Sequence, residues 1–269
     1  IQNIYLTDVT LNSGGISGGL VGFSGDTTIN TVSVEGTTTA TGDYVGGLVG
    51  ALSGSSTVSD SLSNVTLDNT NEYTGGLVGI AQGNSNIHNS VARGTVTSTN
   101  DWTGGFVGLA IQNSEITDSE SHVATTGDRD TGGFVGLATD NSQISNSFAT
   151  GDITSSVGSG GFVGRASGSS SISDSYATGN ISGSAQTNGG FVGFARLDSE
   201  ITNSYATGDV TGDGNTGGFA GRVTADGVFD SLNASGQVTG TIDVGGLIGT
   251  YQGDLNITNS HATGDVTGT

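Results

Sequence analysis

Three aromatic residues occupy one column of a repeating pattern, and each directly follows an acidic residue. The pairs are Asp43-Tyr44, Glu72-Tyr73 and Asp101-Trp102, and each pair falls one repeat after the previous one. If successive repeats stack, the three rings form a strip about 10 Å long that is edged by carboxylates. Aromatic faces beside carboxylates suit a sugar ring, with or without calcium. The alternative interpretation is aromatic stacking that covers a turn, which is worth about 0.5–1.5 kcal/mol per pair.

A second column alternates carboxylates with carboxamides. Its members are Asp60, Asn89, Asp118, Asn146, Asp174, Asn203, Asp230 and Asn259. A column of Asp alone would place like charges about 5 Å apart, which is unfavourable. An interposed Asn amide can donate hydrogen bonds to the carboxylates above and below it. The pattern predicts a structural polar ladder at a corner of the fold, and a calcium site is the functional alternative.

The remaining reactive residues form no catalytic pattern in the sequence. The sequence contains no Cys. Its three His residues fall in different repeats without metal-ligand spacing, and they are His88, His122 and His261. The only basic side chains are five single, dispersed arginines: Arg93, Arg129, Arg165, Arg196 and Arg222. We therefore predict a protein that is not an enzyme and has no cofactor, with calcium left open.

These columns arise because the chain repeats. A Gly-Gly pair followed by an apolar residue recurs with a period of about 28 residues, which is typical of repeat architectures. The first glycines of these pairs are Gly18, Gly46, Gly75, Gly104, Gly132, Gly160, Gly189, Gly217 and Gly245. A β-branched residue keeps the same period from Ile29 to Ile257, and in the eighth repeat we assign it to Val228. Each repeat holds three candidate strands: Gly-Gly-(Leu/Phe)-Val-Gly-x-Ala, the Ile-x-Asn-Ser segment and Ala-Thr-Gly-Asp-Val-Thr.

Short strands between Gly-, Ser-, Thr-, Asn- and Asp-rich turns, without helical periodicity, predict an all-β chain. Three strands in about 28 residues match one coil of a parallel β-solenoid, and parallel crossovers prefer the right-handed sense. We expect about nine coils in a single domain over residues 1–269. The first and last residues share nearly the same phase and no capping coil is visible, so we expect uncapped strand edges at both ends.

The apolar columns predict the core. The residue after Gly-Gly is Leu or Phe and reads Phe in five successive repeats, from Phe106 to Phe219. We expect these side chains to stack inside the coil. The next column is mostly Val and would face outward in a flat strand. Either a bend at the glycines turns both columns inward, or the Val column forms an exposed apolar stripe.

Composition excludes several functions. The net charge of −20 argues against binding nucleic acid, which requires clustered Lys and Arg. No apolar run is long enough to span a membrane as a helix. Sequons at Asn64, Asn180, Asn233 and Asn256 fit an extracellular location.

The segment from Gly189 to Thr211 resembles the GLUG motif repeat, and the resemblance extends over nearly the whole chain. Members of that family occur in large prokaryotic surface proteins, including adhesins with solenoid stalks. Two repeats, over Val58–Asp68 and Ile116–Thr126, lack the Ala-Thr-Gly-Asp sequence. We expect those coils to stack with less regular turns.

The resemblance implies a structural and interaction module, a rod-like spacer in an extracellular adhesin or surface stalk. One alternative is the subunit of an extracellular filament whose copies join end to end. The other is a carbohydrate-binding solenoid that uses the strip from Tyr44 to Trp102. The expected partners are neighbouring coils or subunits and surface glycans, with no nucleic acid.

Overall fold

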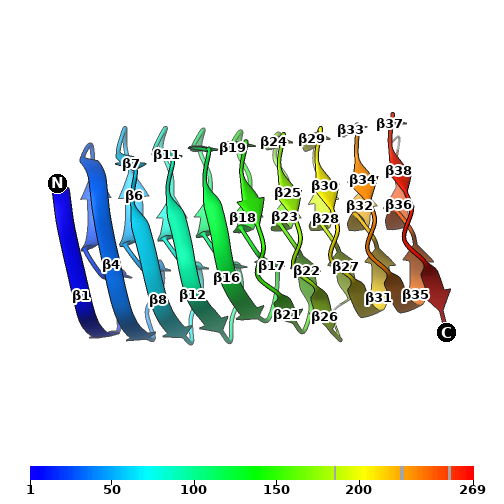
Figure 1. Cartoon of the computed structure of the whole chain (residues 1–269). Coiled ribbons are helices and arrows are strands. Elements are labelled where there is room, and N and C mark those ends of the chain that lie inside the picture. Colours follow the sequence, from blue (N-terminus) through cyan, green and yellow to red (C-terminus); the bar gives the residue numbers. More distant parts are fainter. Residues whose placement is uncertain (185, 225–226, 254–255) are drawn as a thin grey trace.

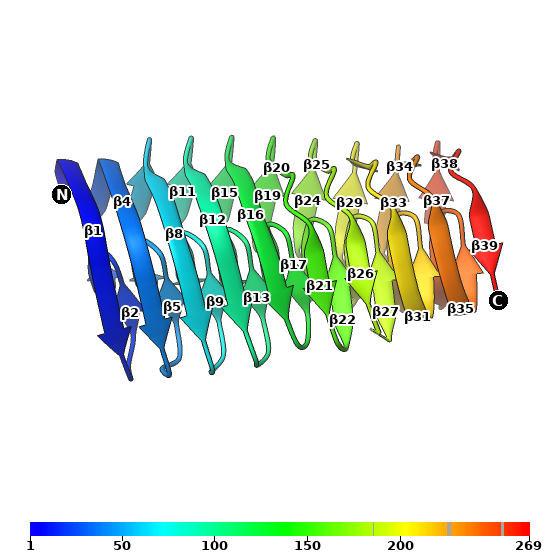
Figure 2. The same cartoon turned by 60° about the horizontal axis from the view of Figure 1, so that its bottom comes forward.

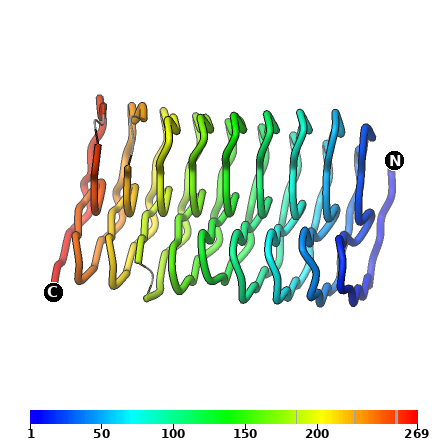
Figure 3. The backbone as a smooth tube through the Cα atoms, turned by 180° about the vertical axis from the view of Figure 1, so that it is seen from behind, coloured from blue at the N-terminus to red at the C-terminus, as the bar shows by residue number. Residues whose placement is uncertain are grey.

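The computed structural model describes residues 1–184, 186–224, 227–253 and 256–269. In these residues the chain forms parallel strands that stack into a rod, and none of them is helical. The two termini lie at opposite ends of the rod (Figures 1 and 3). In Figure 1 the strands on the near side run downward, and the chain rises again behind them as it advances from the N-terminus to the C-terminus. The coil is therefore right-handed. The predicted β-solenoid of about nine turns is confirmed.

One side of the rod is a ladder of nine strands paired in parallel. Its members are β3 (Val21–Gly25), β6 (Val49–Ser53), β10 (Val78–Ala81), β14 (Val107–Ala110), β18 (Val135–Ala138), β23 (Val163–Ala166), β28 (Val192–Arg196), β32 (Ala220–Thr224) and β36 (Ile248–Gln252). Val residues of successive strands are register partners, as in Val78–Val107 and Val107–Val135. We call this side the Val ladder.

The chain leaves the Val ladder through a turn and enters three-residue strands that carry the β-branched column. These are β7 (Thr57–Ser59), β11 (Asn86–His88), β15 (Glu115–Thr117), β19 (Gln143–Ser145), β24 (Ser171–Ser173), β29 (Glu200–Thr202), β33 (Val228–Asp230) and β37 (Asn256–Thr258). Along β24 and β29, Ile172 pairs with Ile201, and both are fully buried.

The next side is built from long strands in the first five coils, which lie in a row in Figure 2. They are β1 (Gln2–Ser13), β4 (Thr28–Ala40), β8 (Leu62–Asn69), β12 (Val91–Ser98) and β16 (Glu120–Gly127). In later coils two strands replace each long one: β20 (Phe148–Ala149) and β21 (Ile153–Ser155), β25 (Tyr176–Ala177) and β26 (Ile181–Gly183), β30 (Tyr205–Ala206) and β31 (Val210–Gly217), β34 (Asn233–Ala234) and β35 (Val238–Gly245), β38 (His261–Ala262) and β39 (Val266–Gly268). Of these, β31 and β35 are long because they continue to the first glycine of the next Gly-Gly pair.

The replacement of one long strand by two coincides with the Ala-Thr-Gly-Asp-like sequence. The strand ends at the Ala in five coils, at Ala149, Ala177, Ala206, Ala234 and Ala262, and the Gly two residues later stacks closely on the preceding coil. In the earlier Ala92-Arg93-Gly94 segment the Gly lies inside the unbroken strand β12, so a Gly alone does not break the strand. A Cβ on Gly179 would lie only 1.9 Å from the carbonyl oxygen of Gly151. The coils without this sequence run straight through as β8 and β16, so our expectation of less regular turns there was wrong.

A short strand leads into each Gly-Gly corner. In the first seven coils these are β2 (Ser17–Gly18), β5 (Val45–Gly46), β9 (Thr74–Gly75), β13 (Thr103–Gly104), β17 (Thr131–Gly132), β22 (Gly158–Gly160) and β27 (Thr187–Gly189). The strand ends at the first glycine and the Val ladder starts two residues after the second one. The coil that starts at β3 contains three strand segments, because β4 pairs with both β7 and β8, and the later described coils contain four or five rather than three.

The Gly-Gly landmark is explained by close backbone contacts at this corner. A Cβ on Gly132 would meet the carbonyl oxygen of Val135 at 2.0 Å, and one on Gly133 would meet that of Gly161 at 2.2 Å. The bend turns both following side chains inward, so Phe134 and Val135 are fully buried. The bend alternative for the Val column is therefore correct, and this column is not an exposed stripe.

The core is a column of stacked rings. The five Phe side chains from Phe106 to Phe219 are fully buried. Their ring centroids follow one another at 4.6, 4.7, 4.9 and 4.8 Å. In the eighth coil the register differs from our assignment. Phe229, and not Val228, pairs with Ile201 and is buried, whereas Val228 is 45% exposed.

Candidate functional site

The aromatic strip exists as predicted, and its rings stack on one another. The ring centroids of Tyr44 and Tyr73 are 4.9 Å apart with planes inclined by 20°. Those of Tyr73 and Trp102 are 4.8 Å apart with planes inclined by 10°. The stack occupies both faces of Tyr73 and one face of each outer ring. A sugar would therefore meet ring edges along the strip and ring faces only at its two ends.

The strip lies over outward-facing side chains of the Val ladder. Tyr44 and Tyr73 pack against the small apolar cluster of Ala51, Ile80 and Leu109. All three strip residues have left-handed backbone, with φ of 57°, 58° and 59° for Tyr44, Tyr73 and Trp102. Such backbone is uncommon for a bulky residue. The left-handed backbone directs the rings over the Val ladder, and their packing there offsets the cost of this conformation.

The polar groups of the strip differ in environment. Arg129 Nη1 donates to Asp101 Oδ2 at 3.1 Å, so this carboxylate is already paired. Asp43 is exposed and Glu72 is half-buried. The indole Nε1 of Trp102 is buried and donates to no acceptor among the described residues. Burial, with the added effect of Glu72 and Tyr44, raises the pKa of Tyr73 to about 12.

The Asp/Asn column lies at a corner where the backbone is left-handed. Asp60, Asn89, Asp118, Asn146 and Asp174 have φ of 50–51°. Asn and Asp tolerate this conformation better than other residues with side chains, which explains why these two types occupy most of the corners. Thr31 and Ser231, with φ of 54° and 58°, are the exceptions. The sequence showed the alternation but not the backbone reason for it.

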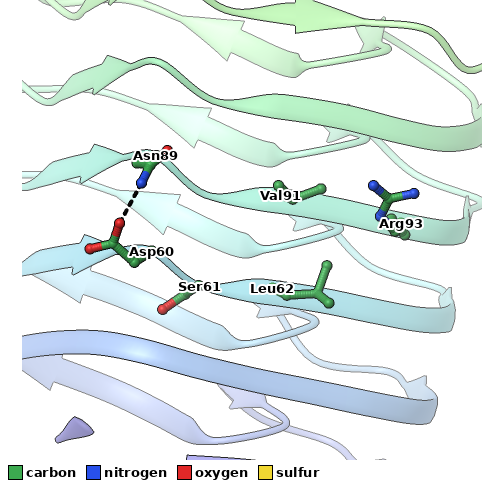
Figure 4. A pocket seen from close by; sticks show the side chains of 6 residues that line it. All are labelled: Asp60, Ser61, Leu62, Asn89, Val91 and Arg93. Carbon is green, nitrogen blue, oxygen red and sulfur yellow. Dashed lines mark hydrogen bonds between the residues drawn. The ribbon is translucent and has the colours of Figure 1, made fainter. Parts of the chain in front are cut away.

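Asn side chains donate to the carboxylate of the preceding coil in three of the four pairs. Asn89 donates to Asp60 beside a shallow hollow of about 330 Å³ that Arg93 also lines (Figure 4). Asn203 Nδ2 donates to Asp174 Oδ1 at 3.3 Å. Asn259 Nδ2 donates to Asp230 Oδ1 at 2.8 Å. The ladder thus pairs successive coils, whereas we had expected each Asn to reach carboxylates on both sides.

The prediction that Asp230 occupies the corner position of this ladder was wrong. The left-handed corner of its coil is Ser231, with φ of 58°, and Asp230 lies one residue earlier, where it pairs with Thr258. This is the same shift in register that places Phe229 in the core. The Asp230 carboxylate still accepts hydrogen bonds from Thr258, Asn259 and Ser231, and these lower its pKa.

The arginines are not dispersed in space, contrary to the sequence interpretation. Arg165, Phe194 and Arg222 are register partners on the outer side of the Val ladder. The Cζ atoms of Arg165, Arg196 and Arg222 lie 5.6, 5.9 and 5.4 Å from the ring centroid of Phe194. The even spacing of Arg165, Phe194 and Arg222, one repeat apart, could have revealed this column.

A second outer column is aromatic as well. The rings of Phe148, Tyr176 and Tyr205 stack with centroids 4.8 Å apart. Beside Phe148, His122 contacts Glu120 Oε2 through Nε2 at 3.0 Å and Thr150 Oγ1 through Nδ1 at 2.8 Å. A carboxylate, an imidazole and a hydroxyl occur in this order in hydrolases. Here Glu120 and His122 lie on β16 and Thr150 follows β20 in the next coil, and none of them lines the hollows beside Glu35, Arg93 or Phe194.

The described residues contain neither a metal-binding cluster nor a helix that could cross a membrane. No group of three His, Asp or Glu side chains is arranged there to hold a metal ion. No helix long and apolar enough to cross a membrane was found in the same residues.

Comparison with known families agrees with this repeat geometry. The model of the GLUG motif matches residues 70–97, 127–154, 155–182, 185–211 and 240–267, which together make up just over half of the chain. The chain belongs to the GLUG motif family. Each GLUG match is about one coil long, and three consecutive ones cover the coils in which Phe134, Phe162 and Phe191 stack. No curated protein matches the chain. No solved structure matches it either.

Proposed function

We propose that this GLUG solenoid is a rod-like spacer in an extracellular adhesin or surface stalk. The observation that carries the proposal is the unbroken parallel ladder from β3 to β36, in which each strand pairs with the next. Nine coils at about 4.8 Å each give a rod of about 43 Å. A rod held by backbone hydrogen bonds and one continuous core gives reach and stiffness without any reactive group.

The acidic surface supports the extracellular part of the proposal. With 25 acidic and 5 basic side chains, the rod repels copies of itself and stays soluble. Such a surface suits a segment that holds another part of a protein away from a cell. End-to-end assembly into a filament is the alternative built on the same ladder.

The location can be tested on intact cells that make the protein, with an antibody against this segment. We expect the antibody to label intact cells and the label to disappear after protease treatment of the cell surface. Denaturing electrophoresis of an extract of these cells, probed with the same antibody, is expected to show a band well above 26.5 kDa, the mass of these 269 residues. Labelling only after lysis would contradict the surface role.

Carbohydrate binding at the aromatic strip is a second candidate. The unpaired Trp102 Nε1 and the carboxylates of Asp43 and Glu72 favour it, because they place polar groups beside aromatic edges. Trp102 is the only Trp in the chain, so its fluorescence reports on this strip alone. A glycan that binds there should change the fluorescence and lose affinity for Trp102→Ala. A variant that changes only in melting temperature would leave the strip as a structural cover.

A further inference from the structure

Four of the five arginines of this acidic chain gather at one place on the rod. Arg165, Arg196 and Arg222 surround the ring of Phe194, and Arg129 lines the same hollow. The net charge of the chain is −20, so a concentration of positive charge is unexpected on this surface. A guanidinium is attracted to an aromatic face, which helps to hold these side chains in place.

The hollow exists because the aromatic strip stops. The column that reads Tyr73 and Trp102 in earlier coils continues with Asp130, Gly158 and Thr187. These smaller side chains do not cover the Val ladder as the rings do. The uncovered space encloses about 310 Å³, with Phe194, Arg165 and Arg222 among its lining residues.

The charges in the hollow are only partly balanced. Arg165 Nη2 lies 2.9 Å from Asp130 Oδ2, and Arg129 pairs with Asp101. Arg222 Nη2 donates to the neutral Gln252 Oε1 at 2.9 Å. Among the described residues no acidic group lies within ion-pair distance of Arg222 or Arg196. Within the described part of the chain, these two guanidiniums therefore have no counter-charge.

Their hydrogen-bonding capacity is unfilled as well. The Nε atoms of Arg165, Arg196 and Arg222 are buried and have no acceptor in the described part of the chain. Buried polar groups in folded proteins nearly always have a partner in the protein, in ordered water or in a ligand, so these three donors can still gain one. Guanidinium groups match the two oxygens of a carboxylate or sulfate with paired hydrogen bonds.

We propose that the hollow around Phe194 binds a small ligand through an oxyanion, a carboxylate or a sulfate. Arg222 lines the hollow and supplies charge that no described acidic group balances, and Arg165 is held in position by Asp130. Arg196 does not line the hollow but adds positive charge from its place over the Phe194 ring. The volume suits a ligand of the size of one sugar acid. This site lies on other coils than the strip from Tyr44 to Trp102, and it does not depend on the spacer function.

Binding can be measured by calorimetry with three probes: sodium sulfate, sodium galacturonate and neutral galactose. We expect the two anions to bind at millimolar concentration and galactose not to bind. Equal affinity for sulfate and galacturonate means that the oxyanion alone is recognised, and tighter binding of galacturonate means that its ring also contributes. The proposal is overturned if neither anion binds, or if galactose binds as well as galacturonate.

Two variants locate the site. Arg222→Gln removes a guanidinium whose protein partner is neutral, and we expect it to weaken anion binding about tenfold. Arg93→Gln is the matched control, because Arg93 lines a different hollow and the change in net charge is identical. We expect less than a twofold effect there. Equal losses in the two variants would show attraction by overall charge and overturn the site. Arg196→Gln is the second test if Arg222→Gln fails to fold.

Discussion

The ring of Trp102 lies flat on the ring of Tyr73, with centroids 4.8 Å apart. Tyr44 covers the other face of Tyr73, and its ring is only half-buried. Such a stack contributes to folding whether or not it binds anything, because each pair is worth about 0.5–1.5 kcal/mol. The strip therefore has a structural role that can be measured apart from any ligand.

Replacing Trp102 by Ala should lower the free energy of unfolding by about 2 kcal/mol, from lost stacking and lost apolar burial. The measurement is urea denaturation followed by circular dichroism. Thr154→Ala, at an exposed position far along the rod, serves as the control and should stay within about 0.5 kcal/mol of the parent. An unchanged midpoint for Trp102→Ala would show that the stack adds nothing to stability.

Tyr73 should make the protein sensitive to alkali. Its pKa is raised to about 12 in the folded chain, against about 10 when unfolded. The unfolded state therefore loses the phenol proton first, so the stabilising contribution is complete below pH 10 and disappears as the pH rises towards 12. Absorbance of tyrosinate near 295 nm measures the titration directly.

Tyr73→Phe is the control for that titration, since the pKa of Tyr176 is also raised. The variant should lack one late-titrating phenol among the six tyrosines. Glu72→Gln should lower the pKa of Tyr73 without returning it to 10, because burial is the larger cause. Titration of every Tyr near pH 10 in the folded protein would contradict the prediction.

The Gly-Gly corner should tolerate no side chain. Gly160→Ala places a Cβ 2.1 Å from the carbonyl oxygen of Val163, so the backbone must shift. We expect a loss of about 3 kcal/mol, measured by urea denaturation. Gly15→Ala is the matched control, because a Cβ there meets nothing within 4 Å. If both variants lose the same stability, the corner contact does not explain the repeated glycines.

The alternation of Asp and Asn should matter electrostatically. Asn89→Asp places three carboxylates in successive coils, at Asp60, position 89 and Asp118, and removes the hydrogen bond to Asp60. We expect a loss of about 0.5–1 kcal/mol at low salt that shrinks in about 1 M NaCl, where the Debye length is about 3 Å.

Asn84→Asp is the control for the ladder. Asn84 also has left-handed backbone, with φ of 61°, and its side-chain partner is the neutral Asn113. The variant should lose less stability and respond less to salt. A loss at Asn89 that is the same at all salt concentrations would point to the missing hydrogen bond rather than to charge.

The periodic residues made the fold predictable. Which side chains lie next to one another on the surface depends on the exact register between successive coils, and this was harder to predict. The Gly-Gly spacing and the Phe column were sufficient to predict a solenoid and its core. Val228 was misassigned because it is β-branched like its counterparts, although Phe229 keeps the regular spacing to the Ile residues of the coils on both sides. The arginines looked dispersed because they were read along the chain, whereas Arg165 and Arg222 become second neighbours once coils stack.

The left-handed corners and the close glycine contacts could not be read from the pattern alone. Strand patterns locate side chains on faces, but they do not give the backbone angles of the residues between strands. The sequence pattern drew attention to the alternation of a charged Asp60 and a neutral Asn89. The left-handed backbone that both residues adopt restricts the choice of residue at these positions more strongly.

Matching columns in every coil have a consequence for how such a protein can change. Removing residues 76–104 would join Gly75 to Gly105, and the two coils brought together would already fit, since Gly75 and Gly104 occupy the same place in the ladder. Recombination between repeats in the coding DNA can thus lengthen or shorten the rod in steps of about 4.8 Å without a new fold having to arise. A feature that extends over several coils, such as the arginines around Phe194, would lose part of its residues with each coil removed.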